Sequence, residues 1–315
     1  MILQIFIFVA GLALLIKGAD WLVDGASALA KKYKVSDLAI GLTIVAFGTS
    51  APELVVNSIA SFQGHQDIVF GNIIGSNNFN LFMILGVAGL ISPLLVQSST
   101  VWKEIPISFV AVFSLYILAN NFNDPASSIL SRIDGIILLV LFFLFLYYVY
   151  KQLKTEHGTK EKHGKTLSLL KIWIFIISGL SGLVIGGKLV ISSAIEMAIT
   201  WGISEKVIGL TIIAVGTSLP ELATSVVATL KRNNDIAVGN VIGSNIFNIF
   251  FILAISSLIK PVYYDVGFNK DIYLLAGGTF FLFAAMFIGH KKKLQRWQAG
   301  ILLTIYIIYT VYLIN

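Results

Sequence analysis

The stretch GTSAPEL, Gly48 to Leu54, places a carboxylate, a proline and two hydroxyls inside an apolar segment, and it recurs as GTSLPEL, Gly216 to Leu222. The second copy follows the first at an offset of 168 residues, since 216 minus 48 is 168. When residues 36–80 are aligned with residues 204–248 at that offset without a gap, 24 of the 45 positions are identical. The match indicates an internal duplication that extends well beyond the motif.

Composition places the chain in a membrane. Of its 315 residues, 57% are hydrophobic and only 12% are charged, about half the charged fraction of soluble domains. Apolar runs recur along the chain, and each is close to the roughly 20 residues that a membrane-crossing helix needs. The first of these runs is too long for the core of a signal peptide, so we interpret it as a span. We count ten runs, at about 3–28, 38–61, 68–92, 105–120, 129–150, 169–200, 205–229, 236–259, 272–289 and 298–314.

Lysine and arginine are distributed unequally between the loops. With ten spans and an external N-terminus, sixteen of these residues fall in cytoplasmic loops and four fall outside, namely Arg132, Lys206, Lys260 and Lys270. Positive charge in membrane proteins concentrates on the cytoplasmic side. We therefore expect a multi-pass protein of the cell membrane, surrounded by the lipid bilayer, with both termini external. The net charge of +6 then needs no nucleic-acid partner.

The two copies of the repeat lie five spans apart. Because five is odd, equivalent segments cross the membrane in opposite directions, as in the inverted repeats of many secondary transporters. The fold class that we predict is therefore an all-α integral membrane protein with ten transmembrane helices in two inverted five-helix repeats. The first repeat is expected at 1–150, a cytoplasmic connecting loop at 151–168 and the second repeat at 169–315.

Each copy of the motif is expected to break its helix, the second and the seventh. Pro52 removes a backbone donor, which leaves the carbonyl of Gly48 without its helical partner. A carbonyl freed at membrane depth must be satisfied by protein, water or an ion. Thr49 and Ser50 precede Glu53 by four and three residues, so both hydroxyls share a helix face with the carboxylate. Pro220 and Glu221 repeat this arrangement.

Inverted copies bring their broken helices together near the midplane, and every polar group there offers oxygen. Oxygen ligands with carboxylates suit hard cations such as Ca²⁺, whereas Zn²⁺ or Cu²⁺ favour imidazole or thiolate. The chain has no cysteine, and its four histidines fall outside the predicted spans. The candidate groups are the side chains of Thr49, Ser50, Glu53, Ser76, Asn80, Thr217, Ser218, Glu221, Ser244 and Asn248, together with the freed carbonyls.

These polar groups have three other possible interpretations. Hydrogen bonding between helices explains the serines and threonines, but it does not explain two glutamates, each costing about 2.5–3.5 kcal/mol at mid-depth. A membrane enzyme is disfavoured because HExxH, a Ser/His dyad within the spans and paired aspartates are all missing from the sequence. A channel is a third possibility, but duplicated proline-broken helices favour alternating access.

Two further features have structural interpretations. Lys17 and Asp20 lie three residues apart in the first run, and we interpret them as a structural ion pair. Gly71 and Gly75 form a small-xxx-small pair that is expected to let another backbone approach closely, and Gly239 and Gly243 repeat it.

At this point the sequence resembles a known family. GTSAPE with GNIIGSNNFN, and GTSLPE with GNVIGSNIFN, are similar to the two alpha-repeats of the sodium/calcium exchanger family, in the calcium/cation antiporter superfamily. The resemblance implies exchange of Na⁺ for Ca²⁺ with three Na⁺ entering, which would generate current, and spans 1 and 6 sliding as a gating unit. Protons are expected to compete by protonating the same carboxylates, and no cofactor is expected. The implied ion ligands are Ala46 (backbone), Thr49, Ser50, Glu53, Ser76, Asn80, Ala214 (backbone), Thr217, Ser218, Glu221, Ser244 and Asn248.

One position departs from the family pattern. Archaeal relatives and the potassium-dependent branch commonly have aspartate at the last position of the second motif, where this chain has Asn248. Two acidic ligands remain, which argues against potassium dependence. Proton-coupled members typically carry a GNAxE-like motif, which neither copy has. The alternatives that stay open are a Ca²⁺/H⁺ antiporter and a K⁺-dependent Na⁺/Ca²⁺ antiporter.

Overall fold

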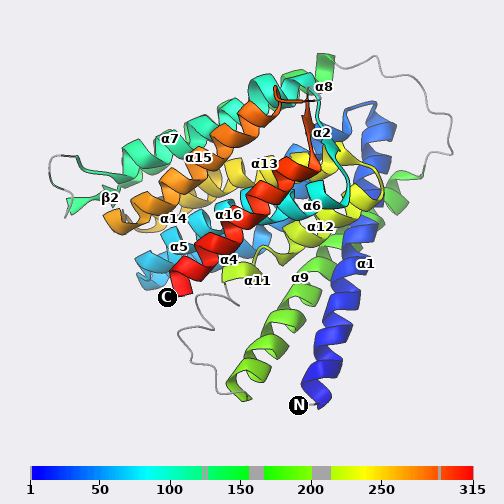
Figure 1. Ribbon diagram of the computed structural model, residues 1–315, viewed down its shortest axis with the longest axis horizontal. Coiled ribbons are helices and arrows are strands. Elements are labelled where there is room, and N and C mark those ends of the chain that lie inside the picture. The colour runs from blue at the N-terminus through cyan, green and yellow to red at the C-terminus, as the bar shows by residue number, and fades with distance from the viewer. Residues whose placement is uncertain are drawn as a thin grey trace.

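The computed structural model describes residues 2–122, 124, 127–155, 167–200, 214–289 and 292–314. These residues are mostly helical, as the apolar runs predict (Figure 1). The first half contains α1 (Ile2–Tyr33), α2 (Asp37–Ile40), η1 (Gly41–Val45), α3 (Ala46–Thr49), α4 (Ala51–Gln63), α5 (Gln66–Asn78), η2 (Phe79–Ile84), α6 (Leu85–Ile91), η3 (Thr100–Glu104), α7 (Ile105–Ala119) and α8 (Arg132–Thr155).

Helices of similar length follow in the described residues of the second half. It contains α9 (Leu169–Thr200), α11 (Ala214–Gly216), α12 (Leu219–Leu230), α13 (Asn234–Phe247), η6 (Asn248–Ile252), α14 (Leu253–Ile259), η7 (Val266–Phe268), α15 (Asn269–Ala285) and α16 (Arg296–Ile314). α8 continues to Thr155, so the helix extends into the predicted connecting loop 151–168. Residues 156–166, with His157 and His163, lie outside the described residues.

Six helical stretches in the described residues are long and apolar enough to cross a membrane, or seven if the bent pair Asp37–Thr49 and Ala51–Gln63 counts as one span. This is fewer than the ten spans that the sequence predicts. α15 has 17 residues, which is below the roughly 20 that a span needs. Residues 205–213 of the predicted seventh span lie outside the described residues. These helices indicate an integral membrane protein. The described helices that are long enough to cross a membrane are fewer than the ten predicted spans.

Both copies of the repeated motif interrupt their helices. The backbone leaves helical geometry at Ser50, with φ −82° and ψ 6°, between α3 and α4, and the two parts are bent by 47°. Ser218 has nearly the same conformation, φ −90° and ψ 7°, before α12. Pro52 and Pro220 each lie in the first turn of the following helix, where the missing N–H has no helical acceptor to lose. The hydroxyls before each proline therefore lie at a helix break.

α1 and α9 pack against each other along glycines, side by side at the lower edge of the view (Figure 1). A Cβ on Gly18 would lie 2.7 Å from the backbone nitrogen of Leu183, and one on Gly179 would lie 2.6 Å from that of Leu22. At such distances any residue larger than glycine would clash with the backbone of the other helix. The buried apolar residues of this pair, with part of α12 and the start of α13, form a cluster distinct from the larger core of the bundle.

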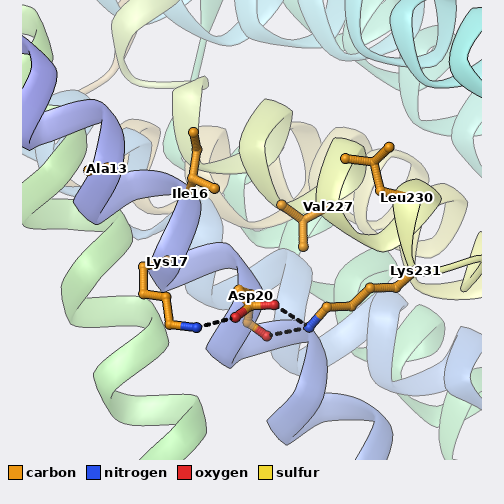
Figure 2. Close-up of a pocket in the computed structure, with 7 residues that line it drawn as sticks. All are labelled: Ala13, Ile16, Lys17, Asp20, Val227, Leu230 and Lys231. Atoms are coloured by element: carbon orange, nitrogen blue, oxygen red, sulfur yellow. Dashed lines mark hydrogen bonds and ion pairs between the residues drawn. The ribbon is translucent and has the colours of Figure 1, made fainter.

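An ion network holds α1 to the end of α12 (Figure 2). The predicted pair is confirmed, with Lys17 Nζ 2.5 Å from Asp20 Oδ2. Lys231 Nζ lies 2.6 Å from Asp20 Oδ1 and 2.6 Å from Asp24 Oδ1. Burial disfavours the ammonium, but its hydrogen bonds to Asp20 and Asp24 prevail and raise the pKa of Lys231. Because these groups are partly exposed, the network contributes little to stability.

The glycine pair of the second repeat permits the close approach that the sequence predicts. A Cβ on Gly243 would lie 2.8 Å from the carbonyl oxygen of Leu42, and one on Gly239 would lie 3.0 Å from that of Leu38. At the 168-residue offset, the partners of Gly71 and Gly75 would be residues 206–210, which lie outside the described residues. The close approach at Gly71 and Gly75 therefore stays a prediction.

Two short strand pairs, which the sequence did not predict, join the halves. β1 (Leu94–Leu95) pairs antiparallel with β4 (Lys293–Leu294), and β2 (Ile129–Leu130) pairs antiparallel with β3 (Val262–Tyr263). Each strand has two residues, too few to show an alternating pattern. Each pair links one half of the chain to the other, outside the helices.

Candidate functional site

Glu53 and Glu221 lie at the centre of the buried polar groups. Each carboxylate is 1% exposed. The ion pairs seen in the described residues join Lys17 and Lys231 to aspartates of α1, and none of them involves Glu53 or Glu221. Two buried, unpaired carboxylates are costly at membrane depth. A cation held between them would offset that cost.

Glu53 is hydrogen-bonded by the other half of the chain. Ser218 Oγ lies 3.0 Å from Glu53 Oε1 and 3.0 Å from Ser76 Oγ. Asn57 Nδ2 donates to the carbonyl of Glu53 at 2.7 Å. The hydroxyl of Ser218, at the second helix break, therefore bonds to the carboxylate of Glu53, which follows the first helix break.

Glu221 has the equivalent surroundings with the halves exchanged. Ser50 Oγ lies 2.8 Å from Glu221 Oε1 and 3.0 Å from Ser244 Oγ. Adding 168 to Glu53 and Ser76, and subtracting it from Ser218, converts one set of contacts into the other. The serine contacts of the two carboxylates therefore correspond, and each carboxylate is bonded by a serine of the other half.

The threonines of the motif bond to two asparagines that the sequence motifs did not predict as ligands. Thr49 Oγ1 donates to Asn240 Oδ1 at 3.0 Å, and Thr217 Oγ1 donates to Asn72 Oδ1 at 3.2 Å. Thr49 Oγ1 also lies 3.3 Å from the carbonyl oxygen of Ala46. With the one hydrogen of each hydroxyl directed to one of these acceptors, the oxygen lone pairs stay available for a cation. Both asparagines stand in the repeated GN that opens the second motif, and this repetition was the signal that could have found them.

Four asparagines form a second layer of contacts between the halves. Asn80 Nδ2 donates to Asn245 Oδ1 at 3.0 Å, and Asn248 Nδ2 donates to Asn77 Oδ1 at 2.9 Å. Asn80 and Asn248 were predicted as ligands, whereas Asn77 and Asn245 were not. The 168-residue offset converts one of these two bonds into the other, as it does for the serine bonds to the glutamates.

Four buried oxygens at this centre accept no hydrogen bond from the described residues. They are Glu53 Oε2, Glu221 Oε2, Asn80 Oδ1 and Asn248 Oδ1. Each is an acceptor, and leaving a buried acceptor without a partner costs about 1–3 kcal/mol, more for a charged one. A hard cation is the ligand that satisfies several oxygens at once. In the described residues no group of three His, Cys, Asp or Glu side chains is placed so that it could hold a metal ion.

The two backbone positions differ from each other. The carbonyl of Ala46 accepts from the amide of Ser50 at 3.0 Å and from Thr49 Oγ1 at 3.3 Å. In the second half the amide of Ser218 donates instead to the carbonyl of Val215, at 3.2 Å. The amides of Ser50 and Ser218 therefore do not bond to equivalent carbonyls.

The fold and the buried oxygens define a membrane transport protein for cations, and comparisons specify the family. The family model described as sodium/calcium exchanger protein matches residues 3–151 and 171–315. The chain is 36% identical to the putative antiporter CaxA of Alkalimonas amylolytica over 98% of both chains. It is 31% identical to the sodium/calcium exchanger MaX1 of Methanosarcina acetivorans, over 98% of this chain and 97% of that one.

A solved structure has the same fold. The sodium-calcium exchanger NCX_Mj matches with a TM-score of 0.84 and 34% identity, over 99% of both chains. The chain belongs to the sodium/calcium exchanger family, as its motifs suggested. It is a cation antiporter of the membrane and not an enzyme.

Proposed function

We propose that the chain exchanges Na⁺ for Ca²⁺ across the cell membrane by alternating access, using ten transmembrane helices in two inverted repeats, 1–150 and 169–315, joined by 151–168. The observation that carries the proposal is the pair of buried glutamates, each bonded by a serine of the other half. The proposed ligands are Ala46, Thr49, Ser50, Glu53, Ser76 and Asn80 in the first repeat and Ala214, Thr217, Ser218, Glu221, Ser244 and Asn248 in the second.

The inverted arrangement is supported by the exchange of contacts under the 168-residue offset. Reciprocal contacts of this kind arise when a two-fold axis relates the halves, and an axis in the membrane plane reverses their direction. The sodium-calcium exchanger NCX_Mj, which has been soaked with Na⁺, Ca²⁺ and Sr²⁺, has a similar fold over nearly the whole chain. That likeness supports the same class of transported ions here.

Charge balance explains the coupling. Glu53 and Glu221 carry two negative charges when ionised, which one Ca²⁺ neutralises, so the loaded site crosses the apolar barrier without net charge. Sodium ions occupy the same oxygens in its place, and any number above two leaves a net positive charge, so exchange generates current. The empty site stays in place because two unpaired carboxylates at mid-depth are costly. Protons compete by neutralising the same carboxylates.

Vesicles reconstituted with the purified chain test this coupling. We expect Ca²⁺ uptake when the vesicles are loaded with Na⁺, accompanied by a membrane current, and no uptake when they are loaded with K⁺ alone or with acid alone. Uptake is measured with a Ca²⁺ isotope and the current with a voltage-sensitive dye. Robust uptake driven by a proton gradient without Na⁺ would select the Ca²⁺/H⁺ antiporter instead, and a requirement for K⁺ together with Na⁺ would select the K⁺-dependent one.

The orientation is tested by labelling single cysteines, since the native chain has none. Phe122 and Lys292 are both exposed, and the charge distribution places the first outside and the second in the cytoplasm. An impermeant thiol reagent is expected to label Phe122→Cys in intact cells, and Lys292→Cys only after the membrane is opened. The reverse pattern would contradict external termini.

Asn248 is the position where this chain departs from acidic relatives. Asn248→Asp adds a third carboxylate to a site with two, so we expect tighter Ca²⁺ binding and transport that falls more steeply as the pH is lowered. The measurement is Ca²⁺ binding and exchange rate between about pH 5 and pH 8, the range in which proteins are usually most stable. An unchanged affinity and pH profile would place Asn248 outside the ion ligands.

A further inference from the structure

Two asparagines at the centre of the bundle, Asn77 and Asn245, bond to the side-chain amides of two proposed ion ligands. Asn77 is 0% exposed and Asn245 is 4% exposed. They occupy equivalent positions, since 245 minus 77 is 168. Each donates to the other's backbone: Asn77 Nδ2 to the carbonyl of Asn245 at 3.3 Å, and Asn245 Nδ2 to the carbonyl of Asn77 at 3.3 Å.

These reciprocal bonds fix which way each amide faces. A backbone carbonyl can only accept a hydrogen bond, so the end of the Asn77 side chain that faces it must be the nitrogen. The oxygen of Asn77 is then the end that faces Asn248, 2.9 Å from its Nδ2. This orientation follows from the bonding partners, which are what distinguish the two ends of an amide.

Their bonding partners also fix the orientation of the two predicted ligand amides, Asn248 and Asn80. With its nitrogen held by Asn77, Asn248 presents its oxygen, and Asn248 Oδ1 has no partner among the described residues. Asn245 Oδ1 likewise accepts from Asn80 Nδ2 at 3.0 Å. Asn80 Oδ1 is then the free end of that amide, and it too has no partner among the described residues. A reversed amide would present N–H donors, which repel a cation.

We propose that Asn77 and Asn245 are positioning residues, which turn the amides of Asn248 and Asn80 oxygen-first toward the transported cations. Asn77 serves the ligand of the second repeat and Asn245 the ligand of the first. The inference rests on the proposed function, because it assumes that Asn80 and Asn248 bind the ions. Asn80 and Asn248 each stand in or at the start of a π-helical turn, η2 and η6, a local geometry that is frequent at functional sites.

A double-mutant cycle separates orientation from structure. In the purified full-length chain, Asn77→Leu is expected to weaken Ca²⁺ binding by about tenfold or more, the usual effect of losing a partner that orients a metal ligand. In an Asn248→Asp background the loss should shrink to about twofold or less, the usual limit of additivity. A carboxylate presents oxygen in either orientation, so it needs no positioning. Binding is measured by calorimetry in Na⁺-free buffer.

Asn80→Asp is the matched control, because it also adds a carboxylate but faces Asn245. Asn77→Leu should still weaken binding by about tenfold in that background. The mirrored cycle pairs Asn245→Leu with Asn80→Asp. If Asn77→Leu does not yield folded protein, Asn77→Ala enters the same cycle, and the melting temperature without Ca²⁺ reports folding.

The outcomes separate the two claims. Equal losses in the native and Asn248→Asp backgrounds, or equal rescue by Asn80→Asp, would overturn the positioning role. Undiminished Ca²⁺ binding in Glu53→Gln would instead overturn the proposed ion site. Loss of binding in Glu53→Gln together with selective rescue of Asn77→Leu by Asn248→Asp is the result that we expect.

Discussion

Glu53→Gln is expected to abolish Na⁺-dependent Ca²⁺ uptake, and Glu221→Gln is expected to abolish it to the same extent. Either change removes one of the two charges that balance Ca²⁺ and replaces a carboxylate oxygen by an N–H donor. The two glutamates have matching surroundings, each with a serine of the other half on Oε1, so neither variant should be milder. Isotope uptake into Na⁺-loaded vesicles measures the effect, and calorimetry measures Ca²⁺ binding.

Glu104→Gln is the matched control for these variants. Glu104 is 0% exposed and its Oε1 accepts from the hydroxyl of Tyr148. It is the last residue of η3, directly before α7, and no hydrogen bond found among the described residues joins it to a proposed ligand. Exchange should therefore persist in Glu104→Gln. Full exchange in either Glu53→Gln or Glu221→Gln would refute the site, and loss in all three would indicate a general effect of neutralising buried carboxylates.

Gly179→Val is expected to have the second largest effect, through packing. A Cβ at Gly179 would lie 2.6 Å from the backbone nitrogen of Leu22 and 2.9 Å from the carbonyl oxygen of Gly18. Both are backbone atoms, so α1 and α9 must separate to admit the side chain. Overpacking in a tight core usually costs about 1–3 kcal/mol, and a rigid helix pair belongs at the upper end. We expect a lower melting temperature and loss of exchange.

Gly277→Val provides the comparison for this prediction. Gly277 lies in α15, and a Cβ there would meet no described atom within 4 Å. Its helix propensity improves on losing glycine, so its melting temperature should be unchanged or slightly raised. If Gly179→Val melts and transports like Gly277→Val, the close contact between α1 and α9 does not limit side-chain size.

Much of the site could be predicted from the sequence because its evidence is local. Pro52 and Glu53 stand together in one motif, and the motif occurs twice, so the helix breaks and the carboxylates follow from neighbouring residues. Asn77 and Asn245 were equally visible in the repeat, but nothing in the sequence distinguishes an amide that binds an ion from one that orients another amide. That distinction depends on which carbonyl each nitrogen reaches.

Some helix boundaries differ from the predicted ones for a related reason. The apolar run predicted from about residue 105 is preceded by a helical turn, Thr100–Glu104, whose Lys103 and Glu104 lower its hydropathy. Glu104 is nevertheless buried, because Tyr148 of α8 meets its carboxylate. A hydropathy pattern measures each residue alone, so it cannot register a distant partner that makes burial of a charge tolerable.

The sequence by itself determined the membrane location, the duplication and the oxygen-only set of candidate ligands, because composition and repetition are properties of the chain before it folds. Only the tertiary structure decided the partnerships. Ser218 bonds to Glu53 and Ser50 to Glu221, and Lys231 bonds to Asp20, although each pair is separated by more than half the chain. Such contacts form where helices cross, and the crossing is set by packing along the whole length of each helix rather than by any residue in the motif.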